Sequence, residues 1–240
     1  MNQLEKGILL LTCIAVALVI LWDLKGLKRT EMKPLIIIGT ILLIGMASRY
    51  ITLSIYALST DVKLLETIRY FYYASSVGLT MLTVCIIWFI VPLYNEKVDL
   101  GIFILFFIPF ILFYGYLIVT QPTRLVESSA YGYELSLIPP FDRYLAFVQG
   151  NFIVVVTILC LIGLVRYKHL QIRIELVILL LAQGLLVIDG IYSGKDQIFI
   201  FKLFTVSEGF TLWTIGYALY HPFRRLRVIR NKTINKKDVS

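Results

Sequence analysis

The sequence predicts an all-α membrane protein, a bundle of seven transmembrane helices with its N-terminus outside the cell and its C-terminus in the cytoplasm. Three observations lead to this prediction. Of the 240 residues, 59% are hydrophobic and only 16% are charged, whereas a soluble globular protein carries about 25% charged residues. Seven apolar segments reach the length of about 20 residues that a helix needs to cross a bilayer. Basic residues gather in the connections on one side of the predicted bundle.

The predicted spans follow one another along the chain, mostly with short connections. They are residues 7–24, 34–58, 68–93, 99–120, 144–166, 174–193 and 198–220. The first runs on to Trp22 without a small-residue cleavage site, so it is interpreted as a retained span and not as a signal peptide. The sixth contains Asp189, and the seventh contains Lys202 and Glu208, which makes these two the least apolar. The spans form one domain over residues 1–222, and residues 223–240 are a basic cytoplasmic tail.

Lysine and arginine set the predicted orientation, because they are enriched in cytoplasmic connections. They cluster in DLKGLKRTEMK after the first span, in RYKHLQIR after the fifth, and in the tail. If either the sixth or the seventh span were not real, the tail would fall on the same side as the N-terminus and break this rule. The net charge of +8 therefore reflects topology and contact with anionic lipid headgroups. We expect a multi-pass protein of the cell membrane whose partner is the lipid bilayer, and no nucleic acid.

One long connection is predicted on the outer side, QPTRLVESSAYGYELSLIPPFDR at residues 121–143. Pro139 and Pro140 rule out a continuous helix there. Tyr131, Tyr133 and Phe141 are aromatic, which favours a segment lying over the bundle. The sequence therefore predicts an outer loop that is placed to act as a lid.

Two opposite charges lie deep inside the predicted spans. Counted from the outer ends of their helices at helical rise, Arg49 is about 13 Å deep and Glu208 about 15 Å deep. An isolated charge near mid-bilayer costs roughly 3 kcal/mol or more, so such residues usually face the bundle interior and pair. We expect a buried Arg49–Glu208 ion pair. It is either a structural clasp between helices or the floor of a ligand pocket, and the sequence favours neither.

Further polar residues accumulate in the outer half. The third span begins with a polar stripe at helical spacing, and the fifth contributes Gln149 or Asn151, only one of which can face a shared site. The inner halves are apolar apart from Glu175, so no polar path for a channel is predicted. The residues near the interface can equally be solvated by snorkelling. The candidate ligand-binding residues are Arg49, Arg69, Tyr73, Gln149, Asp189 and Glu208.

No catalytic, metal-binding or cofactor-binding pattern is recognisable. The chain has no HExxH, no GxSxG and no phosphate-cradling loop, and its two histidines lie at the cytoplasmic ends of different spans. Cys13, Cys85 and Cys160 fall inside spans without a CxxC pair, which is typical of buried thiols that behave as small hydrophobes. We therefore expect a protein that is not an enzyme, with no metal and no cofactor.

Several stretches resemble a known family. They are the segment from Arg49 through LSTDVKLLETIRYFYYASSVGL, the helix ending WFIVPLY, the helix IFILFFIPFILFYGYLIVT with the long loop after it, the run from Arg166 to Arg173, and the last helix FKLFTVSEGFTLWTIGYALYH. Together they resemble the seven-helix sensory module at the N-terminus of many bacterial and archaeal histidine kinases. The resemblance covers almost the whole chain. It implies a sensor whose outer half recognises a signal and whose helices report it inside. No kinase domain follows in this sequence, so the resemblance implies a separate kinase or regulator as partner.

The sequence thus predicts a receptor-like membrane sensor that binds an extracellular small molecule or peptide in an outer-half pocket. A ligand that pairs with Arg49 would compete with Glu208 and shift the packing of the helices. The alternative is a small multi-pass transporter, or an immunity-type membrane protein that neutralises a peptide without any partner.

Overall fold

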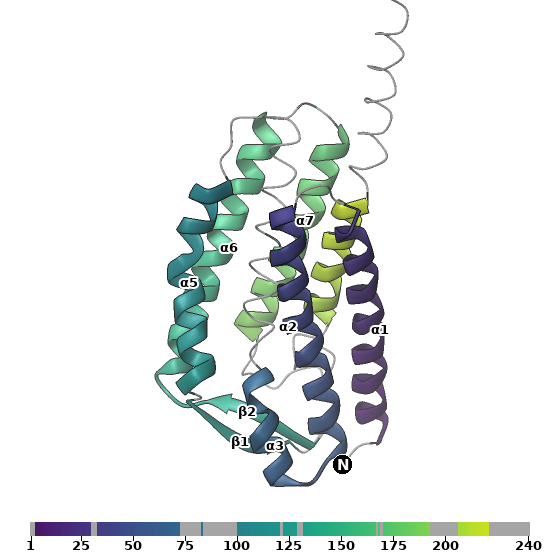
Figure 1. The fold of residues 1–240 in the computed structure, drawn as a ribbon, viewed down its shortest axis with the longest axis vertical. Coiled ribbons are helices and arrows are strands. Elements are labelled where there is room, and N and C mark those ends of the chain that lie inside the picture. The colour runs from purple at the N-terminus through teal and green to yellow at the C-terminus, as the bar shows by residue number, and fades with distance from the viewer. Residues whose placement is uncertain are drawn as a thin grey trace, which may run out of the picture.

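The computed structural model describes residues 3–29, 33–72, 83, 100–120, 122–128, 132–166, 168, 170–192 and 206–220. In chain order its elements are α1 (Gln3–Leu27), α2 (Lys33–Leu58), α3 (Val62–Ile68), the 3-10 turn η1 (Arg69–Phe71), α5 (Leu100–Thr120), β1 (Thr123–Ser128), β2 (Gly132–Leu137), α6 (Phe141–Arg166) and α7 (Leu170–Tyr192). Residues 206–220 are also helical. The long helices lie side by side, with α3 and the two strands together at one end (Figure 1). We call this end the hairpin end and the opposite one the far end.

The described part is mostly helical, as the sequence predicts. Three of its helices are long and apolar enough to cross a membrane: Lys6–Leu27, Leu35–Leu58 and Phe141–Arg166. They coincide with the first, second and fifth predicted spans. Helices α5 and α7 match the fourth and sixth predictions in position, and α5 contains a shorter apolar stretch, Ile108–Leu117. Most of the third predicted span, the start of the seventh and the basic tail lie outside the described residues.

Large apolar side chains point outward as well as inward on these helices. On α1, Leu11 is 68% and Leu18 63% exposed, and on α2 Ile41 is 65% exposed. Soluble monomers do not usually present continuous apolar surface of this kind, whereas lipid covers it. The opposite side of α1 is buried at spacings of four and three residues, the heptad pattern of a helix packed on other helices. This buried stripe comprises Leu9, Cys13, Val16, Ile20, Asp23 and Leu27.

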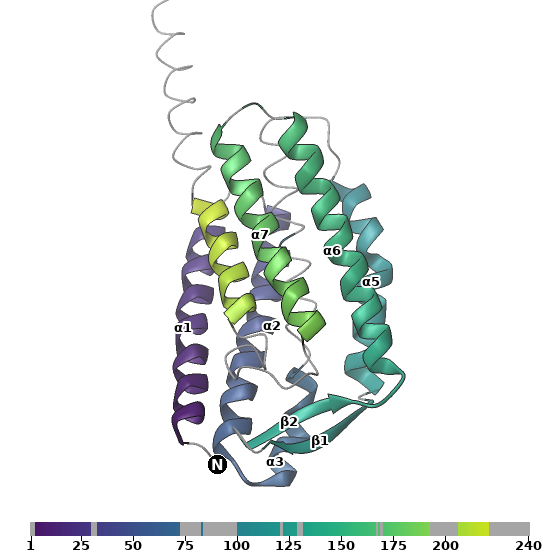
Figure 2. The same ribbon diagram turned by 180° about the vertical axis from the view of Figure 1, so that it is seen from behind.

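Helix α1 and residues 206–220 run parallel in direct contact. A Cβ added at Gly209 would lie 3.1 Å from Val16 Cγ2, and one added at Gly216 would collide with Asp23 and Trp22. Residue numbers increase in the same direction at successive contacts, from Val16 with Gly209 to Asp23 with Gly216, so the two helices are parallel. Glycine at both positions lets the two backbones approach closely, as small residues do between membrane helices. Figure 2 shows residues 206–220 (yellow) between α1 and α7. Two segments far apart in the sequence therefore form one seam.

The connection at residues 121–143, which is predicted as an outer loop, contains a β-hairpin that the sequence analysis did not predict. Strands β1 and β2 are antiparallel, with Thr123 opposite Leu137 and Ser128 opposite Gly132. Leu135 is buried, and its cross-strand partner Leu125 packs against the same core. In β2 apolar residues alternate with Glu134 and Ser136, as expected for a strand with one buried face, because successive strand residues point to opposite faces. Strand β2 contacts α2, so the segment lies against the end of the bundle, as expected for the loop.

Helix α3 connects α2 to the turn η1 at the hairpin end. Asp61 caps it by accepting a hydrogen bond from Lys63 N (3.0 Å), the usual role of an aspartate at a helix start. Leu65 is fully buried, and its carbonyl accepts a hydrogen bond from the hydroxyl of Tyr56 on α2 (2.7 Å). These contacts anchor α3 on α2 and fix the position of η1.

Candidate functional site

The ion pair that the sequence predicts is present between α2 and residues 206–220. Arg49 Nη2 lies 3.3 Å from Glu208 Oε1, and each residue is 6% exposed. Tyr50, the next residue along α2, donates its hydroxyl hydrogen to Glu208 Oε2 at 2.7 Å. Both carboxylate oxygens are thus engaged by α2. A buried charge needs a partner and further hydrogen bonds to offset its desolvation, and Glu208 has both.

Arg49 also contacts the turn at the hairpin end. Its Nη1 donates a hydrogen bond to the carbonyl oxygen of Tyr72 (3.3 Å), and its guanidinium carbon lies 5.5 Å from the centroid of the Tyr72 ring. The ring of Tyr72 in turn lies 5.5 Å from that of Tyr56. Arg49 therefore joins two segments, the residue that follows η1 on one side and residues 206–220 on the other.

A second buried acid extends the cluster to α7. Asp189 is 3% exposed and accepts a hydrogen bond from the hydroxyl of Ser207. It is close enough to Glu208 to repel its charge. Cys13 of α1 lies near the same pair and contacts Ser54. Among the described residues, four helical segments meet at this site, which contains two carboxyl groups and one guanidinium.

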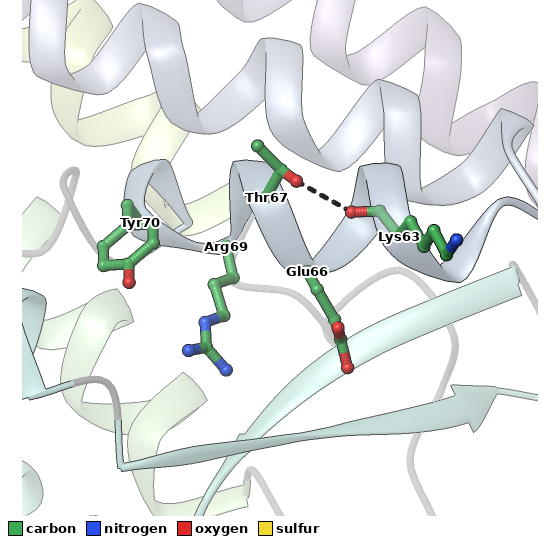
Figure 3. A pocket seen from close by; sticks show the side chains of 5 residues that line it. All are labelled: Lys63, Glu66, Thr67, Arg69 and Tyr70. Atoms are coloured by element: carbon green, nitrogen blue, oxygen red, sulfur yellow. Dashed lines mark hydrogen bonds between the residues drawn. The ribbon is translucent and has the colours of Figure 1, made fainter.

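Arg69 occupies a different place from the pair. It lies in η1 and lines an open hollow of about 420 Å³ at the hairpin end, together with Lys63, Glu66, Thr67 and Tyr70. Glu66 and Arg69 point from the helix toward the strands (Figure 3). The guanidinium carbon of Arg69 is 5.6 Å from the centroid of the Tyr70 ring. With two basic residues, Lys63 and Arg69, and one acid, Glu66, in its lining, the hollow is polar and carries a small positive charge. We call it the outer hollow.

The structure thus divides the six candidate residues. Arg49, Glu208 and Asp189 meet in the buried cluster, and Arg69 lies in the outer hollow. The two places are linked through Tyr72. Its amide donates a hydrogen bond to Arg69 O (3.1 Å), and its carbonyl oxygen accepts one from Arg49. Gln149 lies on α6, and Tyr73 lies outside the described residues.

Sequence reasoning missed three members of the cluster: Tyr50, Tyr72 and Ser207. Tyr50 was hidden because adjacent helix residues point about 100° apart, yet both Arg49 and Tyr50 reach Glu208, one to each oxygen. Tyr72 contacts Arg49 through its backbone carbonyl and its ring face, and no sequence pattern predicts contacts of this kind. For Ser207 a signal existed, since a serine beside a buried acid in an apolar span needs a hydrogen-bond partner.

The half of the bundle toward the far end, which the predicted topology places on the inner side, is not apolar throughout. Asp23 on α1 is completely buried near the far end, and Gln183 is buried in the middle of α7. Thr211 and Thr214 are also buried on residues 206–220, where each hydroxyl bonds to a carbonyl of its own helix. Asp23 is the last but one residue of the predicted span 7–24 and also begins the basic connection DLKGLKRTEMK, whereas α1 continues to Leu27 and carries Asp23 into the seam.

The comparisons assign the chain to no group of known proteins. No family model matches it, and no curated protein matches its sequence. Within the described ranges, no group of three or more His, Cys, Asp and Glu side chains is placed to hold a metal ion. The inference of function therefore rests on the geometry of the buried cluster and its surroundings.

Proposed function

We propose that the protein is a receptor-like membrane sensor that binds an extracellular small molecule or peptide and signals through a separate cytoplasmic or membrane partner. One observation carries the proposal: Arg49 holds the carbonyl of Tyr72 with one nitrogen and the carboxylate of Glu208 with another. This places a single side chain between the outer hollow and the helix that runs on to the far end.

The linkage supplies a physical route for a signal. A ligand in the outer hollow would contact Arg69 and Tyr70, and Tyr72 follows directly after their turn. A shift of Tyr72 changes the hydrogen bond and the ring contact that position Arg49. Because Arg49 is the ionic partner of Glu208, that shift favours a different position of residues 206–220. A ligand acts in this way only if it binds the two arrangements with different affinity.

The direction of the helices supports the proposed topology of seven spans. Helix α1 and residues 206–220 run parallel, so an odd number of crossings lies between them if both cross the membrane, and a topology of seven spans places five there. With the hairpin end outside, the basic residues Lys25, Lys28 and Arg29 lie at the cytoplasmic end, in accord with the enrichment of positive charge there. The resemblance to the sensory module of histidine kinases supports the same arrangement, with a separate kinase or regulator as the partner.

Photocrosslinking in the native membrane tests the proposal. A photoreactive residue at Lys28, which is exposed beyond α1, reports contacts at the cytoplasmic end. We expect one specific protein to be captured, with a yield that changes in the Arg49→Gln and Glu208→Gln variants. Asp142→Asn is the matched control, because Asp142 is an exposed acid at the start of α6. Capture of no specific protein, or a yield equal in all variants, contradicts the sensor proposal.

One observation favours the alternative of a small transporter. Buried polar side chains occur in both halves of the bundle, from Asp189 and Glu208 to Gln183 and Asp23, and polar residues inside membrane segments often mark substrate or ion pathways. This alternative, like an immunity-type role, predicts an effect of the chain alone. Expression in an unrelated bacterium without any partner would then produce flux of a solute or protection from a peptide toxin.

A further inference from the structure

Outside the buried cluster, the most unusual side chain in the described residues is that of Asp23. It is 0% exposed, and neither of its carboxyl oxygens has a hydrogen-bond partner in the described part of the chain. It occupies the heptad stripe of α1, one turn before the end of the helix at Leu27. Buried polar groups in proteins are nearly always hydrogen-bonded, so this carboxyl requires an explanation.

We propose that Asp23 is a proton-binding site: its carboxyl carries a proton while α1 and residues 206–220 are packed together, and loss of that proton separates the two helices. The proposal rests on the packing around the side chain. Gly216 lies directly against Asp23 Oδ1, where any larger residue would collide with Asp23 and the Trp22 ring. No room therefore remains for water or a counter-ion on the side of residues 206–220.

Among the described residues near this end, the charged and titratable groups do not neutralise an ionised Asp23. On α1, Lys25 is exposed and Arg29 lies over the Tyr220 ring, 4.9 Å from its centroid. On residues 206–220, the Tyr220 hydroxyl donates instead to Trp22 O at 3.3 Å. Lys33 of α2 is exposed, and Glu175 of α7 carries the same sign of charge. In the described part of the chain, no basic side chain forms an ion pair with the Asp23 carboxyl.

The aromatic contacts close the site. The rings of Trp22 and Tyr220 are stacked, with centroids 4.9 Å apart, and a Cβ at Gly26 would lie 2.8 Å from Tyr220 Cε2. An isolated carboxylate among such groups is strongly unfavourable, whereas a protonated carboxyl is tolerated far better. Since the packed and separated arrangements bind protons differently, a change in pH shifts the equilibrium between them.

This inference does not rest on the proposed sensor function or on a ligand in the outer hollow. It concerns the same helix, however, because residues 206–220 carry Glu208 toward one end and Gly216 toward the other. If the sensor proposal holds, the Asp23 site makes the output sensitive to cytoplasmic pH. If it fails, the proton site stands on its own measurements.

Infrared spectroscopy of the purified full chain in lipid nanodiscs tests protonation directly. A protonated carboxyl gives a carbonyl stretching band that a carboxylate lacks. We expect the difference spectrum between wild type and Asp23→Asn at neutral pH to contain this band, and the difference between wild type and Asp142→Asn to lack it. Raising the pH should abolish the wild-type Asp23 band reversibly. If Asp23→Asn removes no protonated-carboxyl band, Asp23 is ionised and the proposal is wrong.

Helix separation is measured with spin labels on exposed positions of the two helices, Leu21 on α1 and Trp213 on residues 206–220. The labels are placed in a background lacking the three native cysteines. We expect the distance to lengthen as pH rises in the wild type and to stay at its low-pH value in Asp23→Asn. An equal lengthening in both, or none in the wild type, overturns the proposal. Asp23→Leu replaces Asp23→Asn if the amide variant does not fold.

Discussion

At the scale of single residues, the buried Arg49–Glu208 ion pair contributes little to stability as a whole, yet the loss of one partner is costly. A buried pair adds little net stability, because the desolvation of two charges nearly offsets their attraction. Removing one partner is different, since it leaves the other charge buried without compensation. Glu208 also accepts a hydrogen bond from the hydroxyl of Tyr50. A substitution of Glu208 that keeps a side-chain oxygen therefore removes the charge while retaining this hydrogen bond.

We therefore expect Arg49→Met and Glu208→Gln each to lower the free energy of unfolding by about 3–5 kcal/mol. The double variant should be more stable than either single one, because no unpaired charge remains and the Gln oxygen still accepts from Tyr50. Denaturant unfolding in detergent micelles measures all three. The control pair is Lys63→Met and Glu66→Gln, at exposed positions, with expected changes of at most about 0.5 kcal/mol. Strictly additive losses at positions 49 and 208 would contradict the pairing.

The residues that sequence reasoning located are those whose charge is costly at their depth. Arg49 and Glu208 could be paired from depth alone, because membrane spans limit both their height and their choice of partner. Tyr50 and Tyr72 could not be placed, since their contacts depend on how neighbouring segments are rotated. The burial of Asp23 could not be predicted because the span 7–24 ends one residue after it, whereas α1 continues to Leu27, and the ends of helices are uncertain by several residues when they are predicted from sequence.

At the scale of elements, the seam between α1 and residues 206–220 depends on glycine at two positions seven residues apart. The spacing matches the heptad stripe of α1, so the same side of each helix faces the partner over successive turns. Such a seam is invisible in either segment alone, because glycine in an apolar span also occurs where nothing approaches. Gly184 of α7 is an example, with no atom within 4 Å of an added Cβ.

Gly216→Ala should lower the free energy of unfolding by about 1–3 kcal/mol, the usual effect of overpacking a close contact. The added Cβ would meet Trp22 Cε3 at 2.6 Å, and the bulky ring cannot move aside easily. Gly184→Ala is the matched control and should be neutral or raise stability by up to about 1 kcal/mol, because alanine favours the helix. Thermal unfolding of the two variants in parallel decides the matter. Equal changes in stability for the two variants would contradict a close contact between Gly216 and α1.

Elements that depend on local pattern were easier to predict than those that depend on contacts. The long helices follow from apolar length alone, and their bounds agree with the structure within a few residues for α2 and α5. The hairpin was predicted only as a loop over the bundle, although the alternation of apolar and polar residues around Leu135 is that of a strand. Helix α3 is too short for a periodic pattern and is held by its cap and by Tyr56.

At the scale of the whole molecule, the arrangement of helices and the distribution of charge lead to one topology. Helix α1 runs from the hairpin end to the far end and α2 runs back, so the turn at Thr60 and the connection at Lys28 lie at opposite ends (Figure 1). Three helices of the described part have the length and hydropathy of spans, and seven are expected from the sequence. A topology of three spans and one of seven place the connection after α7 on opposite sides of the membrane.

Cysteine accessibility in intact cells distinguishes three spans from seven. In a background without native cysteines, Thr60→Cys should react with an impermeant maleimide from outside, and Lys28→Cys and Lys168→Cys only after permeabilisation. These positions are exposed and give the same result for three or seven spans. Lys195→Cys decides, because position 195 lies outside only if α7 crosses the membrane. Labelling of Lys195→Cys only after permeabilisation would mean that α7 does not cross. Residues 206–220 would then start from the cytoplasmic side, and they could not cross the membrane while running parallel to α1. The Arg49–Glu208 pair would then join a transmembrane helix to a segment that does not cross the membrane, and the proposed transmission of a signal along residues 206–220 would fail.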